Sequence, residues 1–399
     1  MKALRNYLNK IKPQFEPGGK LQAFQSVFEG FESFLFTPDT TSRSGVNIHD
    51  SLDSKRIMII VVLALMPCLL FGMYNAGYQN WLAAGATEFP FWELMTYGFL
   101  AVVPRIAVAY IVGLGIEFAV AQWRHEEIQE GFLVTGILIP LVCPIATPLW
   151  MIAVATAFSV IFVKEVFGGT GFNIFNVALV TRAVLFFGYP AQMSGDKVFV
   201  LDHSICGFGH DLVDGFSGAT PLGQIASFAG GNLELLNLKG DPVTAVDAFF
   251  GLIPGSFGET STLAILIGAV ILLATGIASW RIMLSVFAGG LFMGFVAHFF
   301  ATPTYPASFL SPVEQLLFGG FAFAAVFMAT DPVTAARTNP GKYVYGFLVG
   351  AMAIIIRTYN NGYPEGAMLA VLLGNALAPL IDYCVVQLNV ARRRRRALN

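Results

Sequence analysis

Charged residues are scarce in this 399-residue chain, at 12% of the total, whereas soluble domains carry about 25%. The chain is instead 56% hydrophobic, with a mean hydropathy of +0.67. It contains more apolar runs than one soluble core could use, and several are long enough to cross a membrane, which takes about 20 helical residues. The scarcity of charge therefore excludes a soluble domain and predicts an all-α integral membrane protein.

Motifs for metals and nucleotides are also missing. The cysteines show no CxxC or Cys/His spacing, so the sequence offers no protein-held metal or iron–sulfur cluster. No GxGxxG string follows a strand and no P-loop occurs, which argues against a nicotinamide or nucleotide site. The first 50 residues lack the apolar core of a signal peptide and predict a retained N-terminal extension. Soluble redox chemistry would therefore have to come from partner proteins.

Apolar runs separated by glycine, proline and charged residues predict about ten transmembrane helices. The expected spans are 57–75, 91–120, 132–145, 148–163, 173–188, 261–279, 282–300, 315–330, 343–358 and 366–388. They divide the chain into an N-terminal extension at 1–55, a polytopic membrane domain at 56–390 with a long connection at about 189–254, and a basic tail at 391–399.

Lysine and arginine fall mainly on one side of the predicted spans. Most of the 23 lie in the N-terminal extension, the tail and alternate connections. The long connection on the other side holds only Lys197 and Lys239. Because positive charge accumulates in cytoplasmic loops, both termini are expected in the cytoplasm and the long connection outside it.

Several predicted spans are interrupted by glycine and proline, in PLVCPIATP (140–148), KEVFGGTGFN (164–173) and ATDPVTAARTNPGK (329–342). Non-helical backbone at membrane depth is tolerated only where protein or water satisfies it, so these breaks mark an interior. They fall in both halves of the chain. The pattern predicts an inverted repeat of five plus five spans with broken half-helices.

Ionisable residues within or beside the spans are functional candidates, because charge in a membrane is costly. They are Arg105, Glu117, Glu130, Arg182, Asp331, Arg357, Glu365 and Asp382. Asp382 and Glu130 are the candidates for a cation pathway, since alkali ions take carboxylate oxygens, although each could also be a solvated helix end. Arg105 and Glu117 are equally consistent with a structural role, in which they pair with each other or with groups at the membrane interface. His298, alone on an apolar run, is expected in the core.

The polar string DGFSGATPLGQ at 214–224 places Thr220 in a long connection of an otherwise apolar chain. Taken alone it is typical of an ordinary loop, because Asp, Gly, Ser and Pro favour turns. The rest of the chain gives it another meaning.

Six segments, in this order and spacing, closely resemble the Nqr/Rnf family of membrane subunits from ion-translocating redox complexes. They are KEVFGGTG (164–171), NVALVTRA (176–183), DGFSGATPL (214–222), FMATDPV (327–333), TNPGKYVYG (338–346) and YPEGAMLA (363–370). LNKIKPQFEPGGKL and DSLDSKRIMI extend the resemblance over nearly the whole chain. The long extension before Asp53 favours the B subunits of the Nqr branch over the ferredoxin-linked D subunits of the Rnf branch. One departure is Val177, where the family usually has proline.

The resemblance implies that Thr220 carries FMN through a phosphoester on its hydroxyl. Ser217, Gly218 and Ala219 are small enough to admit a flavin transferase, and Asp214 would be part of what the transferase recognises. It further implies a riboflavin held by this subunit, a quinone as substrate and Na⁺ as the transported ion. It assigns no catalytic residue, and no metal site is expected.

The implied function is that of a membrane subunit of an NADH:quinone reductase that moves sodium outward across the bacterial inner membrane. Gly131 and Phe132 are the candidates for the quinone region. Partners would be an NADH-oxidising subunit with flavin and iron–sulfur centres, a second FMN-bearing subunit, a flavin transferase and membrane lipid, with no nucleic acid. A flavin-free channel or secondary transporter is the alternative, because broken helices would serve it equally well.

Overall fold

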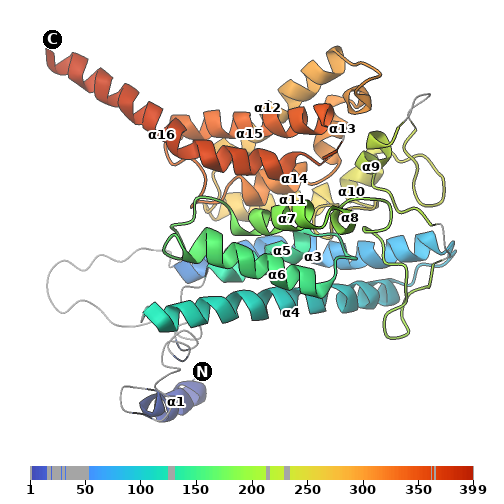
Figure 1. Cartoon of the computed structure of the whole chain (residues 1–399), viewed down its shortest axis with the longest axis horizontal. Coiled ribbons are helices and arrows are strands. Elements are labelled where there is room, and N and C mark those ends of the chain that lie inside the picture. The colour runs from blue at the N-terminus through green and yellow to red at the C-terminus, as the bar shows by residue number, and fades with distance from the viewer. Residues whose placement is uncertain are drawn as a thin grey trace.

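The structure is a computed structural model that describes residues 2–15, 19, 28, 32, 54–124, 131–212, 216–228, 234–360, 362–363 and 365–398. Every named element within these residues is helical, which confirms the predicted all-α fold (Figure 1). The elements are α1 (Lys2–Ile11), η1 (Lys12–Gln14), α3 (Ser54–Ala83), α4 (Phe91–Arg124), α5 (Phe132–Val142), α6 (Leu149–Ser159), η3 (Val160–Glu165), α7 (Val177–Gly188), α8 (Pro190–Met193), α9 (Pro221–Ala226), α10 (Ala245–Phe250), α11 (Thr262–Ala274), α12 (Trp280–Phe299), η4 (Pro306–Phe309), α13 (Pro312–Leu317), α14 (Phe321–Phe323), η5 (Ala324–Met328), α15 (Asn339–Tyr359) and α16 (Ala367–Leu398).

Within the described residues, four helices are long and apolar enough to cross a membrane. They are α3, α4, α12 and α16, and α5, α7 and α11 are shorter apolar helices. A whole or broken helix lies at each span predicted from the sequence. The molecule is therefore built as a membrane protein, while the inverted repeat stays a prediction.

The helices break where glycine and proline were expected to break them. α5 ends at Val142, and the stretch from Cys143 to Pro148 that follows is non-helical. α6 continues into the π-helix η3, and the chain then turns through Gly168, whose φ of +114° is a conformation that favours glycine. In the second half, η5 is also a π-helix. Such segments are rare and concentrate at functional sites.

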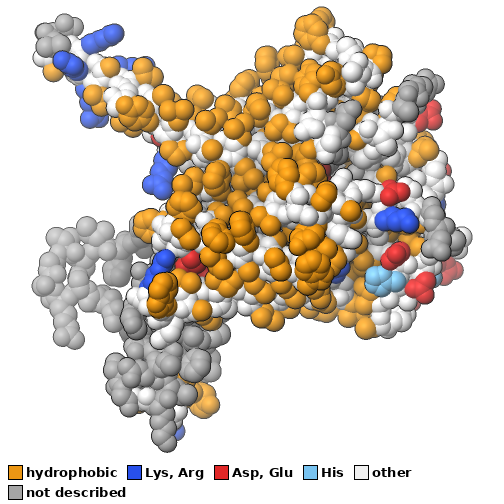
Figure 2. Space-filling model, viewed as in Figure 1, with side chains coloured by type: hydrophobic (Ala, Val, Ile, Leu, Met, Phe, Trp, Pro, Cys, Tyr) orange, Lys and Arg blue, Asp and Glu red, His pale blue; other side chains and the backbone are white. Residues whose placement is uncertain are grey.

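The molecule has two distinct ends (Figure 1). α3 begins and α16 finishes at the left of Figure 1, which we call the tail face. α8, α9 and α10 gather at the right, which we call the loop face. Hydrophobic side chains dominate the surface between the two ends, with the arginines of the tail beyond one end and most of the visible acidic side chains at the other (Figure 2).

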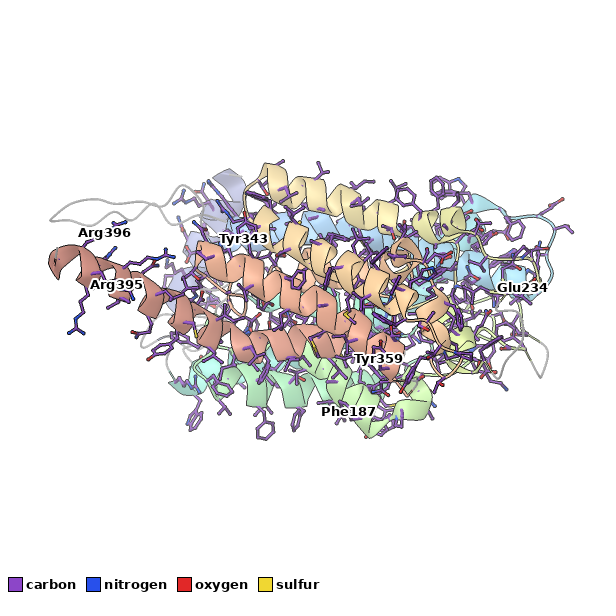
Figure 3. All side chains as sticks on the ribbon, turned by 90° about the horizontal axis from the view of Figure 1, so that it is seen from above. Phe187, Glu234, Tyr343, Tyr359, Arg395 and Arg396 are labelled. Atoms are coloured by element: carbon purple, nitrogen blue, oxygen red, sulfur yellow. The ribbon has the colours of Figure 1, made fainter. Side chains whose placement is uncertain are left out.

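α15 connects the two faces. Tyr343 and Tyr359 lie near its opposite ends, with Arg395 and Arg396 beyond the tail face and Glu234 on the loop face (Figure 3). One continuous core of buried apolar side chains joins the helices of the first and second halves of the chain. The broken segments cross this core, so their polar groups are enclosed by protein.

Candidate functional site

Thr220 lies at the N-terminal end of α9, on the loop face. Its Oγ1 accepts a hydrogen bond of 3.0 Å from the Gly223 N–H and so caps this short helix. Pro221 follows at the first helical position, where the N–H that proline lacks would have no partner in any case. The side chain of Thr220 is half-buried and Ser217 is exposed. The loop therefore holds the Thr220 hydroxyl in a fixed position at the surface.

The chain on both sides of this threonine is anchored. Upstream, the Gly218 N–H donates to the Asp196 carbonyl, and a Cβ at Gly218 would lie 3.1 Å from that oxygen. Downstream, the Gln224 side chain donates to the Ala219 carbonyl at 3.2 Å and to the Leu236 carbonyl at 2.7 Å. Gln224 Oε1 also accepts from the Leu236 N–H at 3.0 Å. These contacts fix a loop that turn-forming residues alone would leave adaptable.

A small cavity, which we call the outer cavity, lies beneath Thr220. Pro254, Thr260 and Gly319 contribute to its wall, as do Glu259 and Glu365. It leaves about 20 Å³ for the centres of water-sized molecules, which is room for a water or two. The outer cavity therefore lies between Thr220, in the segment 216–220 that we call the threonine loop, and the carboxylates of Glu259 and Glu365.

Arg182, on α7, lies at the centre of a buried ionic cluster. Its guanidinium donates to Glu259 Oε1 at 2.8 Å and to Ser256 Oγ at 3.1 Å, and it pairs with the carboxylate of Glu365. The side chains of Arg182 and Glu259 are 4% and 6% exposed, and that of Glu365 is 21% exposed. Buried charges persist in a membrane interior when they are paired, as these are.

Arg357, on α15, completes the cluster and is only 2% exposed. It donates to the backbone carbonyl of Glu365 at 3.2 Å and to that of Gln315. Its Nε is buried and has no hydrogen-bond partner in the part of the chain that the structure describes. Two arginines and two glutamates thus balance in charge; we call Arg182, Glu259, Arg357 and Glu365 the charge cluster.

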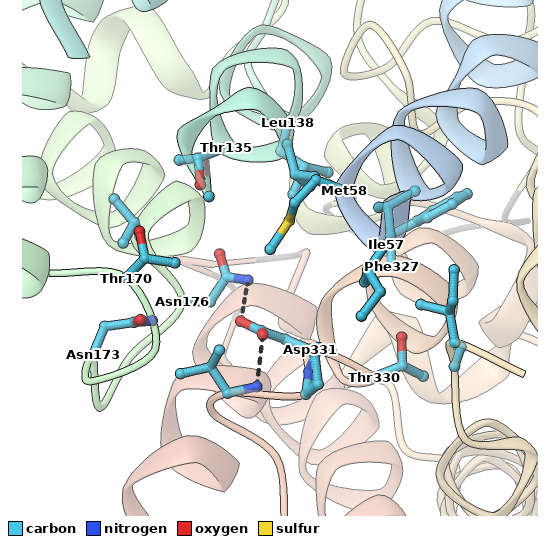
Figure 4. A pocket seen from close by; sticks show the side chains of 18 of the residues that line it. Ile57, Met58, Thr135, Leu138, Thr170, Asn173, Asn176, Phe327, Thr330 and Asp331 are labelled. Carbon is cyan, nitrogen blue, oxygen red and sulfur yellow. Dashed lines mark hydrogen bonds between the residues drawn. The ribbon is translucent and has the colours of Figure 1, made fainter. Parts of the chain in front are cut away.

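A larger cavity, the tail cavity, lies nearer the tail face and leaves about 110 Å³ for water-sized centres. Side chains of α3, α5 and α7 line it, together with residues of both broken segments (Figure 4). Met58, Leu138 and Phe327 supply apolar walls, whereas Asn176 and Asp331 present polar atoms.

Asn176 and Asp331 join the two halves of the chain across this cavity (Figure 4). The Asn176 amide donates to Asp331 Oδ2 at 3.2 Å, and its Oδ1 accepts from the Leu179 N–H at 3.2 Å, which caps α7. Asp331 also accepts from the Val333 N–H at 3.0 Å and from Thr334 Oγ1 at 3.2 Å. The polar side of the cavity is therefore held rigidly by both broken segments.

Lys164, on η3, also lines the tail cavity. It forms an ion pair with Glu117 of α4, and the two side chains are 5% and 6% exposed. The Lys164 ammonium lies 5.9 Å from the centre of the Phe132 ring. Thr170, from the same wall, has a buried hydroxyl without a partner among the described residues. The cavity therefore combines apolar walls with one member of a buried ion pair and a hydroxyl group that has no partner among the described residues.

A family model described as "NQR2, RnfD, RnfE family" matches residues 41–391. The chain belongs to this family. Curated relatives named as the B subunit of the Na(+)-translocating NADH-quinone reductase match it nearly end to end. Those of Ectopseudomonas mendocina and Azotobacter vinelandii are 42% identical over 412 residues, covering 98% of this chain and 98% of each relative. That of Yersinia pestis is 42% identical over 422 residues, covering 98% and 99%.

In this NQR2, RnfD, RnfE family member, the structure places most of the predicted loop residues together. Ser217, Gly218, Ala219 and Thr220 form one anchored segment on the loop face. Asp214 lies outside the described residues, so its role in recognition stays a prediction.

The predicted quinone region falls at the start of α5. Gly131 lines the tail cavity, and a Cβ there would lie 2.4 Å from the Thr170 methyl group. Phe132 is fully buried, with its ring centre 6.2 Å from that of Tyr110. Glu130, one of the two cation candidates, lies outside the described residues.

Asp382, the other cation candidate, lies on α16 and binds the start of α15. Its carboxylate accepts from the Arg337 N–H at 2.7 Å, from the Thr338 N–H at 3.0 Å and from the Thr338 hydroxyl. These contacts place Asp382 at a joint between two helices.

The structure excludes one alternative left open for single residues and contradicts one expectation. Arg105 and Glu117 do not pair, because twelve positions along one helix separate them by about 18 Å; Arg105 donates to the Ala101 carbonyl, and Glu117 pairs with Lys164. His298 is exposed on the last turn of α12 and is not a core residue.

Sequence reasoning missed Glu259 and Lys164, because both were assigned to connections between spans. A signal for Lys164 was present, since it ends the apolar run FSVIFVK (158–164). Glu259 follows a glycine-rich stretch and carries no comparable signal.

Proposed function

We propose that this chain is the membrane subunit of a sodium-translocating NADH:quinone reductase that carries FMN covalently on Thr220. Supporting this, relatives with that subunit name cover 98% of the chain, including the N-terminal residues that precede the family match. That coverage favours the NADH-linked branch over the ferredoxin-linked D subunit of the Rnf branch. The observation that carries the proposal is the Thr220 hydroxyl, held at the surface beside Gly218 and Ala219.

The residues around Thr220 suit attachment of a flavin phosphate. Thr220 Oγ1 accepts the Gly223 N–H, which fixes the oxygen in position. As the Oγ1–P bond forms, the transferase would break a phosphoanhydride bond of its flavin donor, release the rest of the donor as the leaving group and take up the hydroxyl proton. Ser217 and Ala219 add no bulk that would keep a flavin transferase from the backbone, and Asp214 is proposed to be part of what it recognises. FMN, when attached, supplies the electron transfer, and the chain supplies its position.

We assign the riboflavin to the tail cavity. Met58, Leu138 and Phe327 suit the faces of a flat ring system, while Asn176 and Asp331 present polar atoms to its edge. The unpartnered Thr170 hydroxyl fits a ligand that would complete its hydrogen bonding. Lys164, in its ion pair with Glu117, adds a polar group to the cavity wall.

The quinone is proposed to bind beside Gly131 and Phe132, and Asp382 and Glu130 are proposed to handle Na⁺. The tail face would then be cytoplasmic in the inner membrane, and the loop face outside. The partners are an NADH-oxidising flavin and iron–sulfur subunit, a second FMN-bearing subunit and lipid.

The test uses the chain expressed with a flavin transferase and separated on a denaturing gel. The wild-type band should fluoresce under ultraviolet light, and the Thr220→Ala band should be dark. Thr244 is a matched control, because it also caps a short loop-face helix through its hydroxyl; Thr244→Ala should keep the fluorescence. A dark wild-type band would contradict the proposal and favour a flavin-free transporter.

A further inference from the structure

The tail cavity is followed by a second internal space along α7. The tail cavity borders Val177, at the start of α7, and Phe327 of η5. Further along α7, a central cavity borders Leu179 and Arg182, with Ala324 and Met328 of η5. The central cavity leaves about 10 Å³ for water-sized centres, close to the minimum for one water.

The central cavity meets the outer cavity at the charge cluster. Glu259 and Glu365 line both spaces, so their carboxylates form the wall between them. Arg182 holds these carboxylates together, although one precedes α11 and the other precedes α16. Gly320 fits closely on the other side, since a Cβ there would lie 2.6 Å from the Glu259 carboxyl group. The central and outer cavities thus meet at this wall, and the outer cavity reaches Thr220. The tail cavity, which we assign to the riboflavin, shares no lining residue with the central cavity.

The geometry points to the charge cluster as the outer gate of a cation path through this subunit, closed here by Arg182 bridging Glu259 and Glu365. The inference rests on the proposed function, because it requires that cations cross this chain. A space that holds only one or two waters does not pass a hydrated sodium ion, so the path is shut at this wall.

The composition of the gate explains how it opens for cations without leaking. When Arg182 leaves one carboxylate, that buried charge needs another cation, and sodium supplies it. Arg357 stays on the backbone carbonyl of Glu365 and keeps that turn in place. The gate is neutral when closed, with two arginines and two glutamates, so removing one charge leaves it with a net charge.

The sign of that net charge gives opposite predictions for two substitutions. Arg182→Gln leaves the gate net negative, which concentrates cations, whereas Glu365→Gln leaves it net positive, which repels them. A role limited to holding the fold together predicts the same defect in both variants. Arg182→Lys keeps the charge and serves as the conservative variant.

The test uses the assembled complex in liposomes, with ²²Na⁺ uptake measured without NADH and with NADH plus quinone. Arg182→Gln should raise passive uptake about tenfold or more, within the range of electrostatic effects in charged passages. Glu365→Gln should keep passive uptake at the wild-type level and lower NADH-driven uptake by a similar factor. Arg182→Lys should match wild type. Arg105→Gln alters a half-buried arginine that does not line the central or outer cavity, and should leave passive uptake unchanged.

Wild-type passive uptake in assembled Arg182→Gln, or increased passive uptake in Glu365→Gln, overturns the gate. If the Arg182→Gln complex fails to assemble, the Glu365→Gln variant is sufficient for the test, because it keeps the pair between Arg182 and Glu259. Wild-type NADH-driven uptake in Glu365→Gln also overturns the gate. Flavin fluorescence at Thr220 and NADH:quinone activity are measured in the same preparations. Their absence in wild type contradicts the proposed function, whereas their presence with an unchanged leak contradicts only the gate.

Discussion

At the scale of single residues, buried polar atoms without partners are the most informative feature of this protein. Thr156 and Thr170 both have hydroxyl oxygens of this kind among the described residues. Thr170 lines the tail cavity, and Thr156 does not. An unpaired buried hydroxyl lowers the free energy of unfolding by about 1–3 kcal/mol. A folded protein therefore tolerates such a hydroxyl most readily where a ligand supplies the missing hydrogen bond.

Replacing Thr170 by valine should therefore have two effects of opposite sign. Valine has nearly the same shape and removes the unpaired hydroxyl, so the ligand-free protein should gain roughly 1 kcal/mol in free energy of unfolding. The riboflavin that we propose for the tail cavity should lose a hydrogen bond, and its affinity should fall about fivefold to tenfold. Acid-extracted flavin per complex and the thermal midpoint measure the two effects.

Thr156→Val is the matched control for this substitution. It should bring a similar gain in stability and leave the flavin content unchanged, because Thr156 lies on α6 away from the tail cavity. Equal flavin content in the two variants would remove Thr170 from the flavin site.

The roles of residues whose contacts are close in sequence were predictable. The string around Thr220 contains both the cap and the small residues that the structure shows. The partners of Lys164 and Arg182 were not, because Glu117 and Glu259 lie 47 and 77 positions away. No local pattern encodes such pairs, since they depend on how helices cross.

At the scale of elements, close contact between α12 and α15 depends on missing side chains. A Cβ at Gly350 would lie 2.0 Å from the Val286 carbonyl oxygen, and one at Gly289 would lie 2.3 Å from the Phe347 oxygen. Small residues let backbones approach closely where hydrophobic force between membrane helices is weak. Close packing of the α12 and α15 backbones in the second half of the bundle therefore requires glycine at these positions.

Gly350→Ala should force these helices apart and lower the free energy of unfolding by about 1–3 kcal/mol. Gly115→Ala on α4 is the control, because an added Cβ there meets open space. It should be neutral or slightly stabilising, since alanine favours helix over glycine. Thermal unfolding in detergent measures both, and an equal response would show that the crossing tolerates the methyl group.

Helix locations were predictable from apolar runs, whereas their interruptions were predictable only in part. The span expected at 315–330 is broken at Gly319, whose φ of +67° ends α13 before α14 begins. Conversely, α16 continues through the tail that was expected to be separate, because arginine is a good helix former. The π-helices have no sequence signature that hydropathy could reveal.

At the scale of the whole molecule, the distribution of lysine and arginine predicts which face meets the cytoplasm. Cys206 is exposed on the loop face, and Ala397 is exposed near the end of α16, whereas Cys68 and Cys143 are buried. Cys384 is also exposed, on α16, and is replaced by serine for labelling. These positions allow the orientation to be tested with little change to the sequence.

A membrane-impermeant maleimide should label Cys206 in intact cells. A cysteine at Ala397→Cys should react only after the cells are permeabilised, and Cys68 and Cys143 should stay unlabelled until denaturation. Labelling of Cys206 only in permeabilised cells would reverse the orientation and exclude attachment of FMN outside the cytoplasm.

The span of the charge cluster along the chain also bears on how the protein is made. The partners of Arg182 follow far along the chain, with Glu259 77 residues and Glu365 183 residues after it. During synthesis, the short helix α7 would enter the bilayer with an uncompensated arginine, which is costly at membrane depth. The charge cluster is thus complete only after the chain has been synthesised as far as Glu365, and a fragment that ends at α8 lacks both carboxylates that pair with Arg182.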